Sequence, residues 1–133
     1  MDVDENGLYR YNYFDQYWTE NERFPFLIKV NEKYGGFAFV RKLKHETGSS
    51  YYSMAEFFIL KKYRKIGVGK QSAFQLFNFF PGEWEISEVE ENIPSQWFWR
   101  RIISEYTNGR YIETEKKNGR GPVQRFYSME DTM

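Results

Sequence analysis

The sequence predicts a single α+β domain, and three observations support this prediction. Its length of 133 residues is enough for one domain that buries about two-thirds of its unfolded surface. Six segments have the short apolar or alternating pattern of β-strands, and two others repeat apolar residues at helical spacing. Their order along the chain is β-β-β-α-β-α-β-β. The domain is expected to occupy residues 1–133, with the acidic residues 1–7 frayed.

The first half of the chain predicts three strands, at residues 25–30, 37–42 and 54–60. Residues 31–36 contain Gly35 and Gly36 and are expected to form a hairpin turn in which these glycines adopt positive φ. Residues 43–51 are expected to be a polar loop, with the single histidine, His45, in solvent. Ahead of these strands, tyrosines alternate with polar residues over 8–17, a pattern that favours a strand and leaves a helix open.

The second half predicts two helices and three strands. The first helix covers residues 68–80, ends at Pro81-Gly82, and carries one apolar stripe formed by Ala73, Leu76, Phe77 and Phe80. The second helix starts at Pro94, which suits a first turn, and ends at Asn108-Gly109. Its apolar stripe consists of Trp99, Ile102, Ile103 and Tyr106. A strand at 84–89 lies between the helices, and 111–115 and 123–129 form a closing hairpin.

A glycine-containing turn joins the third strand to the first helix, with the sequence Arg64-Lys65-Ile66-Gly67-Val68-Gly69-Lys70. The first N–H groups of a helix have no internal acceptor, and the helix dipole is positive there, so this turn predicts a phosphate site. A nucleotide-binding P-loop would need glycine at Arg64 and serine or threonine at Gln71. The dinucleotide fingerprint would need glycine at Ser72. Neither motif fits.

Arg64, Gly67 and Gly69 match the pattern [RQ]-x-x-G-x-[GA], which resembles the acetyl-CoA pyrophosphate motif of the GNAT superfamily of N-acetyltransferases. Residues 92–99 resemble the second cofactor helix of that family, N-x-x-[AS]-x-x-[FL]-[YFW]. Residues 55–59 and 98–101 resemble a bacterial branch of predicted acetyltransferases. The resemblance covers about residues 24–128. It implies a GNAT-like acyl-CoA N-acyltransferase fold: a mixed, mostly antiparallel twisted sheet with helices on both faces. Only about two dozen residues precede Pro25, too few for the strand and helices that usually open the domain in this family. Three interpretations stay open: a member with a shortened N-terminus, a domain completed by a partner, or a gene product that lacks its start.

The resemblance also implies an activity, the transfer of an acetyl group from acetyl-CoA to a primary amine by direct attack in a ternary complex. The acceptor would be a small amine or a peptide amine. Main-chain groups of Ile59 and Leu60 would pair with the pantetheine amides, and the turn would hold the pyrophosphate. The residues expected to contact acetyl-CoA are Ile59, Leu60, Arg64, Lys65, Ile66, Gly67, Val68, Gly69, Lys70, Asn92, Ser95 and Trp99.

Glu56 is the candidate catalytic base, because a carboxylate in an apolar strand is costly without a purpose or a partner. At pH 7 only about one lysine-type amine in 2,500 is neutral, so a base that accepts a proton would help the attack. The family often carries a base on this strand. Two alternatives stay open for this carboxylate: it faces solvent, or it pairs with Arg41.

Two further features bear on proton transfer. Glutamates crowd residues 83–91, which favours a solvated edge; the alternative is a funnel for cationic acceptors in which Glu88 or Glu90 relays a proton. Many family members protonate the leaving thiolate with a tyrosine of the second helix, where this chain has Trp99. Either the thiolate leaves with help from water, or Tyr106 or Tyr127 takes that part.

Composition restricts the other function classes. There is no cysteine, so disulfides, thiolate metal sites and a cysteine nucleophile are excluded, and no metal is expected. Nineteen basic side chains balance nineteen acidic ones, which argues against nucleic acid, including binding by the basic hairpin at 116–125. No membrane-length apolar run occurs, and a cytoplasmic protein, able to form a homodimer, is expected. The main alternative to an enzyme is a non-catalytic acyl-CoA-binding module that acts as a sensor or assembly part.

Overall fold

The computed structural model describes residues 8–10 and 22–129. The strands are β1 (Leu8–Arg10), β2 (Arg23–Val30), β3 (Lys33–Lys44), β4 (Ser50–Ile59), β5 (Gly82–Ser87), β6 (Ile112–Glu115) and β7 (Pro122–Ser128). The helical elements are the 3₁₀ turn η1 (Lys61–Tyr63) and the α-helices α2 (Val68–Phe79) and α3 (Ile93–Thr107). Most of the predicted segment 8–17 lies outside the described residues.

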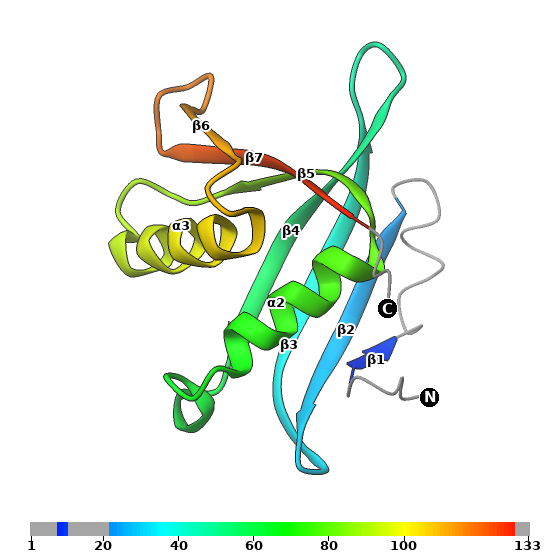
Figure 1. The fold of residues 1–133 in the computed structure, drawn as a ribbon, viewed down its shortest axis with the longest axis vertical. Coiled ribbons are helices and arrows are strands. Elements are labelled where there is room, and N and C mark those ends of the chain that lie inside the picture. Colours follow the sequence, from blue (N-terminus) through cyan, green and yellow to red (C-terminus); the bar gives the residue numbers. More distant parts are fainter. Residues whose placement is uncertain (1–7, 11–21, 130–133) are drawn as a thin grey trace.

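The described strands form one seven-stranded sheet in the order β1-β2-β3-β4-β5-β7-β6 (Figure 1). Every neighbouring pair is antiparallel except β4 and β5, which run parallel. A parallel pair needs a crossover, and α2 supplies it. The predicted α+β class and the mostly antiparallel sheet are therefore confirmed.

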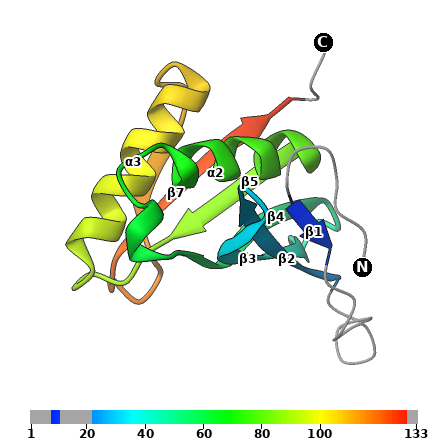
Figure 2. The same ribbon diagram turned by 90° about the horizontal axis from the view of Figure 1, so that it is seen from below.

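Both described helices cover the same face of the sheet (Figure 2). Phe77 of α2 contacts Trp99 of α3 at 6.5 Å between ring centroids, and both helices contact β7 through Phe126. The expectation of helices on both faces is therefore wrong for residues 22–129. In this part of the chain the opposite face, here called the outer face, carries no helix.

The core between the helices and the sheet is built mainly from aromatic rings. Phe77 and Trp84 are fully buried and meet edge to face at 5.0 Å. Such pairs contribute about 0.5–1.5 kcal/mol beyond their burial. The predicted apolar stripe of α2 is buried in full, and so are Trp99, Ile102 and Ile103 of α3.

The β2–β3 hairpin turns at a different place from the predicted one. Asn31 and Glu32 form the turn with φ of 49° and 69°, which suits a two-residue hairpin. Gly35 and Gly36 lie inside β3 instead. A Cβ on Gly36 would be 2.1 Å from the carbonyl oxygen of Phe58 on β4. Gly36 is therefore needed for the close approach of two backbones, and not for the turn.

Candidate functional site

The central feature of the candidate site is a gap between β4 and β5. The two strands pair only at Tyr52–Trp84 and Ser53–Glu85. Beyond Ser53, β4 continues to Ile59 with no pairing from β5, and the two strands diverge (Figure 1). The edge of β4 beyond Ser53 therefore has no strand partner on the side of β5, and α2 begins just beyond the end of β4.

The hydrogen bonds of β4 show which groups face this gap. The N–H of Leu60 donates to the carbonyl of Gly35 at 2.7 Å, and the carbonyl of Leu60 accepts from Tyr63. Because an antiparallel ladder alternates its direction, the N–H and C=O groups of Phe57 and Ile59 point toward the gap. The expectation that Leu60 lines the cofactor path does not fit these bonds, since both of its main-chain groups are occupied. Phe57 takes its place beside Ile59.

The turn before α2 leaves main-chain donors exposed, as the motif predicts. Gly67 is the N-cap, with φ of 88°, and no side chain caps the helix. Its carbonyl accepts the first intrahelical bond, from Gln71, so the N–H groups of Val68, Gly69 and Lys70 have no acceptor within the helix. A Cβ on Gly67 would meet nothing within 4 Å. Gly67 is therefore required by its φ, and the space above it is open. Lys65 (φ 68°) and Ile66, which is 65% exposed, complete the turn.

Gly69 serves a different purpose from Gly67. A Cβ on Gly69 would lie 3.1 Å from the ring of Phe98 on α3 and 3.7 Å from the side chain of Ile59. The second glycine of the motif thus lets α2, α3 and the end of β4 come together at the mouth of the gap. Any side chain there would press against the aromatic ring of α3.

The two motif cations contact protein groups. Arg64 donates from Nε to the carbonyl of Ile59 at 2.8 Å, and its guanidinium lies 5.5 Å from the ring of Phe58. Lys70 pairs with Glu105 at 2.7 Å, and this exposed pair lowers the pKa of the Glu105 carboxyl. Arg64 therefore ties the turn to the gap edge of β4, and Lys70 ties α2 to α3.

Glu56 lies on the outer face, one residue beyond a β-bulge. Ala55 has no partner on β3, because Val40 pairs with Met54 and Phe39 pairs with Glu56. Glu56 is exposed. No hydrogen bond or ion pair joins it to Arg41 within the described ranges. The bulge changes the direction of β4 at the point where β5 separates from it. Glu56 therefore lies at the end of the gap where the two strands begin to diverge, which we call the upper end.

The residues of the second predicted cofactor segment have structural tasks. Asn92 caps α3, accepting from the N–H of Ser95 at 3.1 Å. Trp99 is 6% exposed and packs on Phe57 at 5.0 Å, so it walls the gap from the side of α3. The hydroxyl of Tyr106 donates to Asn78 at 2.6 Å, far along α3, whereas Tyr127 is 72% exposed.

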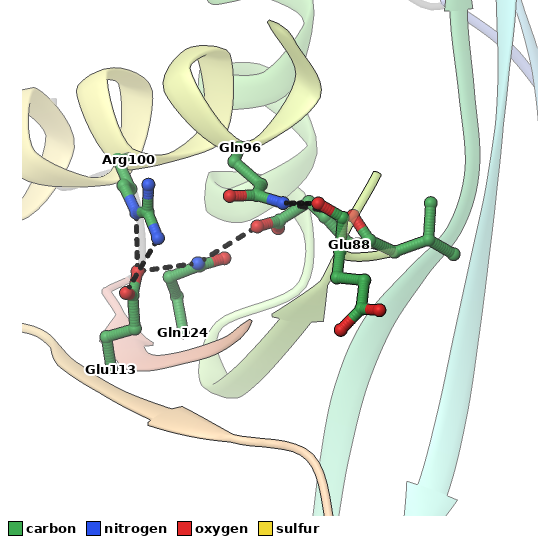
Figure 3. Close-up of polar contacts among 7 residues, drawn as sticks. Glu88, Gln96, Arg100, Glu113 and Gln124 are labelled. Carbon is green, nitrogen blue, oxygen red and sulfur yellow. Dashed lines mark hydrogen bonds and ion pairs between the residues drawn. The ribbon is translucent and has the colours of Figure 1, made fainter. Parts of the chain in front are cut away.

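A buried polar cluster lies under α3, and we call it the Glu88 cluster (Figure 3). Of its members, the sequence predicts a role only for Glu88, as an alternative proton relay. Gln124 donates from one Nε2 to Glu88 at 3.0 Å and to Glu113 at 2.9 Å. Arg100 of α3 holds Glu113 with two bonds, at 2.8 and 2.9 Å. Gln96 donates to the carbonyls of the loop after β5. The cluster links α3 to β6, β7 and the end of β5.

Glu88 is the unusual member of this cluster. It is 5% exposed, and its Oε2 has no hydrogen-bond partner in the described structure. Burial raises the pKa of the Glu88 carboxyl to about 7, against the opposing hydrogen bond from Gln124. A sequence signal existed: Trp84, Ile86 and Glu88 alternate onto the buried face of β5. The carboxylate points toward Gln124 and beneath α3 (Figure 3), not toward β4.

The other glutamates of this region are partly paired. Glu83 bonds to His45 at 2.9 Å, and Glu85 pairs with Arg125 at 3.3 Å, both on the outer face. Of these glutamates, only Glu90 and Glu91 are exposed. The predicted solvated edge is therefore wrong for Glu88. The prediction of a solvated His45 is only partly right: the side chain is 34% exposed, but its ring bonds to Glu83 and stacks on Tyr51 at 4.3 Å.

Two general searches of the described residues complete the picture of this site. No helix there is long and apolar enough to cross a bilayer. No group of three or more histidine, aspartate or glutamate side chains gathers there in a way that could hold a metal ion.

Comparison with known proteins identifies this fold. No protein-family model and no curated protein sequence matches the chain. Solved structures do match. A Thermus thermophilus acetyltransferase superposes with a TM-score of 0.61 at 11% identity, over 80% of this chain and 64% of the other. The chain has the GNAT fold.

Two other structures show the same GNAT fold and carry a ligand. A GNAT-family acetyltransferase from Elizabethkingia anophelis, with acetyl-CoA bound, superposes with a TM-score of 0.60 at 12% identity, over 93% of this chain and 99% of the other. An N-acetyltransferase, PaiA, from Thermoplasma acidophilum in complex with coenzyme A gives 0.61 at 9% identity, over 86% and 65%. This chain thus spans less than two-thirds of the length of two of the three GNAT structures.

Proposed function

We propose that the protein is an N-acetyltransferase that moves an acetyl group from acetyl-CoA to a primary amine. The observation that carries this proposal is the opening of β4 from β5, which leads directly to the uncapped start of α2. The strand edge offers main-chain groups for a pantetheine chain, and the helix start offers donors for a pyrophosphate. GNAT structures with bound CoA or acetyl-CoA share this fold.

The acyl donor would be held mainly by the backbone. The N–H and C=O groups of Phe57 and the N–H of Ile59 would pair with the pantetheine amides, because the carbonyl of Ile59 already accepts from Arg64. The N–H groups of Val68, Gly69 and Lys70 would bind the pyrophosphate, and Lys65 would add charge. Arg64 would act as a positioning residue, because it fixes the turn against the carbonyl of Ile59. Trp99 would exclude water from the thioester on the side of α3.

The chemistry at the upper end of the gap would depend on Glu56. Its carboxylate stands beside the bulge on the outer face, where an amine acceptor has access. It would take the proton of the attacking ammonium, directly or through water, and the neutral amine would attack the thioester carbon. The attacking nitrogen then releases its second proton to water, the amide forms as the carbon–sulfur bond breaks, and CoA leaves as a thiolate, because Trp99 has no phenol to protonate it.

The direct test measures release of free CoA from acetyl-CoA with polyamines, aminoglycosides, amino acids and peptide N-termini as acceptors. With a productive amine, Glu56→Gln is expected to lower kcat about 100-fold or more, since general bases contribute roughly 10²–10⁴-fold. CoA affinity should stay the same. Glu46→Gln, which removes an exposed carboxylate from the β3–β4 loop, is the matched control.

A second candidate function is a GNAT-like module that binds acyl-CoA without turnover. Trp99 in place of the tyrosine favours it. Tight acetyl-CoA binding, together with no acceleration by any amine in the panel, would support the module and contradict the enzyme.

A further inference from the structure

Arg41 occupies a distinctive place on the outer face. Its neighbour Val40 is fully buried against the helices, so the alternation of β3 turns Arg41 the other way. It pairs across the ladder with Ser53, the last residue of β4 that still pairs with β5. Arg41 therefore stands at the point where the gap opens, on the same face as Glu56.

Arg41 differs from two nearby cations on the outer face, which have carboxylate partners. His45 bonds to Glu83, and Arg125 pairs with Glu85. Within residues 22–129, no carboxylate lies within ion-pair distance of Arg41, and its buried Nε–H has no acceptor. A buried charged donor without an acceptor is costly, and native structures rarely leave one in place without a reason.

The opposite strand places a second cation on this face. Arg23 is the direct cross-strand partner of Arg41. It lies on the same face, because Phe24 and Phe26 turn inward to meet Phe80 of the helix side. An anion that binds beside the Arg41 guanidinium would satisfy the Nε–H of Arg41.

We infer that Arg41 binds an anionic group of the acceptor, so that the acceptor is an amine carrying a carboxylate or a phosphate. Guanidinium presents Nε–H and Nη–H as a planar fork that matches the two oxygens of such a group. This inference rests on the proposed function, since it takes Glu56 as the place where the amine reacts.

The sheet geometry also limits the size of the acceptor. Arg41 faces Ser53, and Glu56, beyond the bulge, pairs with Phe39, two residues from Arg41 on β3. Diagonal neighbours of this kind are about 7–8 Å apart. The amine and the anion should thus be separated by a short chain, which makes ω-amino acids suitable probes.

The experiment compares matched acceptors in the acetyl-CoA assay. Glycine, β-alanine and γ-aminobutyrate are each tested against their neutral amides, and phosphoethanolamine against ethanolamine. We expect kcat/KM for at least one anionic acceptor to exceed that for its neutral partner by about tenfold or more, mainly through KM. Arg41→Gln should bring this ratio close to one, and Arg41→Lys should give an intermediate ratio. Arg110→Gln, which removes an exposed arginine elsewhere, should leave the ratio unchanged.

Binding is measured in parallel by saturation-transfer NMR, which needs no turnover. One outcome separates the two proposals: no amine is acetylated, but β-alanine binds, β-alaninamide does not, and Arg41→Gln abolishes the binding of β-alanine. In that case the proposed activity fails and the anion site stands. Equal rates and equal binding for anionic and neutral acceptors overturn the inference while leaving the activity intact. A preference for phosphoethanolamine alone identifies the anion as a phosphate, and a preference for amino acids alone identifies it as a carboxylate. Thermal unfolding of each variant confirms that it is folded.

Discussion

The turn before α2 and the Glu88 cluster under α3 solve opposite problems. The turn presents main-chain N–H groups that no side chain caps, and its cations contact other parts of the protein. The cluster consists of side chains that bond to one another under a helix, with one carboxylate oxygen of Glu88 and the amide oxygen of Gln124 left without a partner. The first region depends on the conformation of one glycine, and the second on the identity of side chains from four different elements.

This difference determines how each region should respond to mutation. A main-chain site tolerates changes of most side chains but fails when its special φ is lost or when its open space is filled. A buried side-chain cluster fails when a charge loses its partner, and its energy depends on pH. Substitutions in the two regions can therefore separate binding from stability.

The largest expected effect on binding is that of Gly67→Asp. It places a side chain at φ of 88°, fills the open space and adds a negative charge where the pyrophosphate is proposed to bind. We expect CoA affinity in calorimetry to fall on the order of 100-fold or more, as charge-assisted bonds are lost and repulsion is added.

Gly48→Asp is the matched control for this variant. Gly48 has φ of 95° and nothing within 4 Å of an added Cβ, but it lies in the β3–β4 loop. The Gly48→Asp variant therefore introduces similar backbone strain and the same negative charge as Gly67→Asp, but at a position away from the turn before α2. Equal loss of affinity in both variants, or no loss in Gly67→Asp, would contradict the proposed pyrophosphate site.

Local patterns were enough to predict most of the fold and the turn. The stripe of Ala73, Leu76 and Phe77, and the spacing of Gly67 and Gly69, are each contained within a few residues. Single-element patterns of this kind are set by helical and strand periodicity, which the sequence shows directly.

The features that were missed depend on contacts between distant elements. Gln124 reaches Glu88 across 36 residues, and Gly36 is small because a carbonyl of β4 approaches it. The placement of His45 against Glu83 is also such a contact, over 38 residues. Tertiary packing decides these positions, and local propensity has no access to it.

The largest expected effect on stability is that of Gly121→Ala. A Cβ at this position would lie 2.3 Å from the carbonyl oxygen of Glu88, and the clash is with backbone, which cannot move aside easily. We expect a loss of about 3 kcal/mol or more in the free energy of unfolding. Gly119→Ala, in the same loop with nothing within 4 Å, should lose only about 1–2 kcal/mol through its positive φ. Urea denaturation of both proteins checks this, and similar losses would show that the contact of the loop with Glu88 is unimportant.

The smallest of these effects is the pH dependence of stability contributed by Glu88. We expect this dependence from the Glu88 cluster and not from the turn before α2, so it distinguishes the two regions. Burial in the folded state raises the pKa of Glu88 from 4.5 to about 7. The negative charge of Glu113 also raises this pKa, whereas the positive charges of Arg100 and Lys116 lower it. Below pH 4.5 the carboxyl is protonated in both states, so its burial is tolerated. As pH rises toward 7 the unfolded chain releases the proton first, so stability should decrease across this window and be lowest above it. Each pKa unit corresponds to about 1.4 kcal/mol, which sets an upper bound of about 3 kcal/mol.

Glu88→Gln should remove this slope and raise the free energy of unfolding at pH 8 by roughly 2 kcal/mol. The new amide can still accept from Gln124 and can donate to its unpartnered Oε1. Denaturation curves at pH 5 and pH 8, compared with those of the exposed control Glu90→Gln, measure the difference. Parallel pH profiles for wild type and Glu88→Gln would show that the buried carboxyl does not carry the raised pKa. If Glu88→Gln leaves the affinity for CoA unchanged while Gly67→Asp lowers it, the two regions are energetically separate.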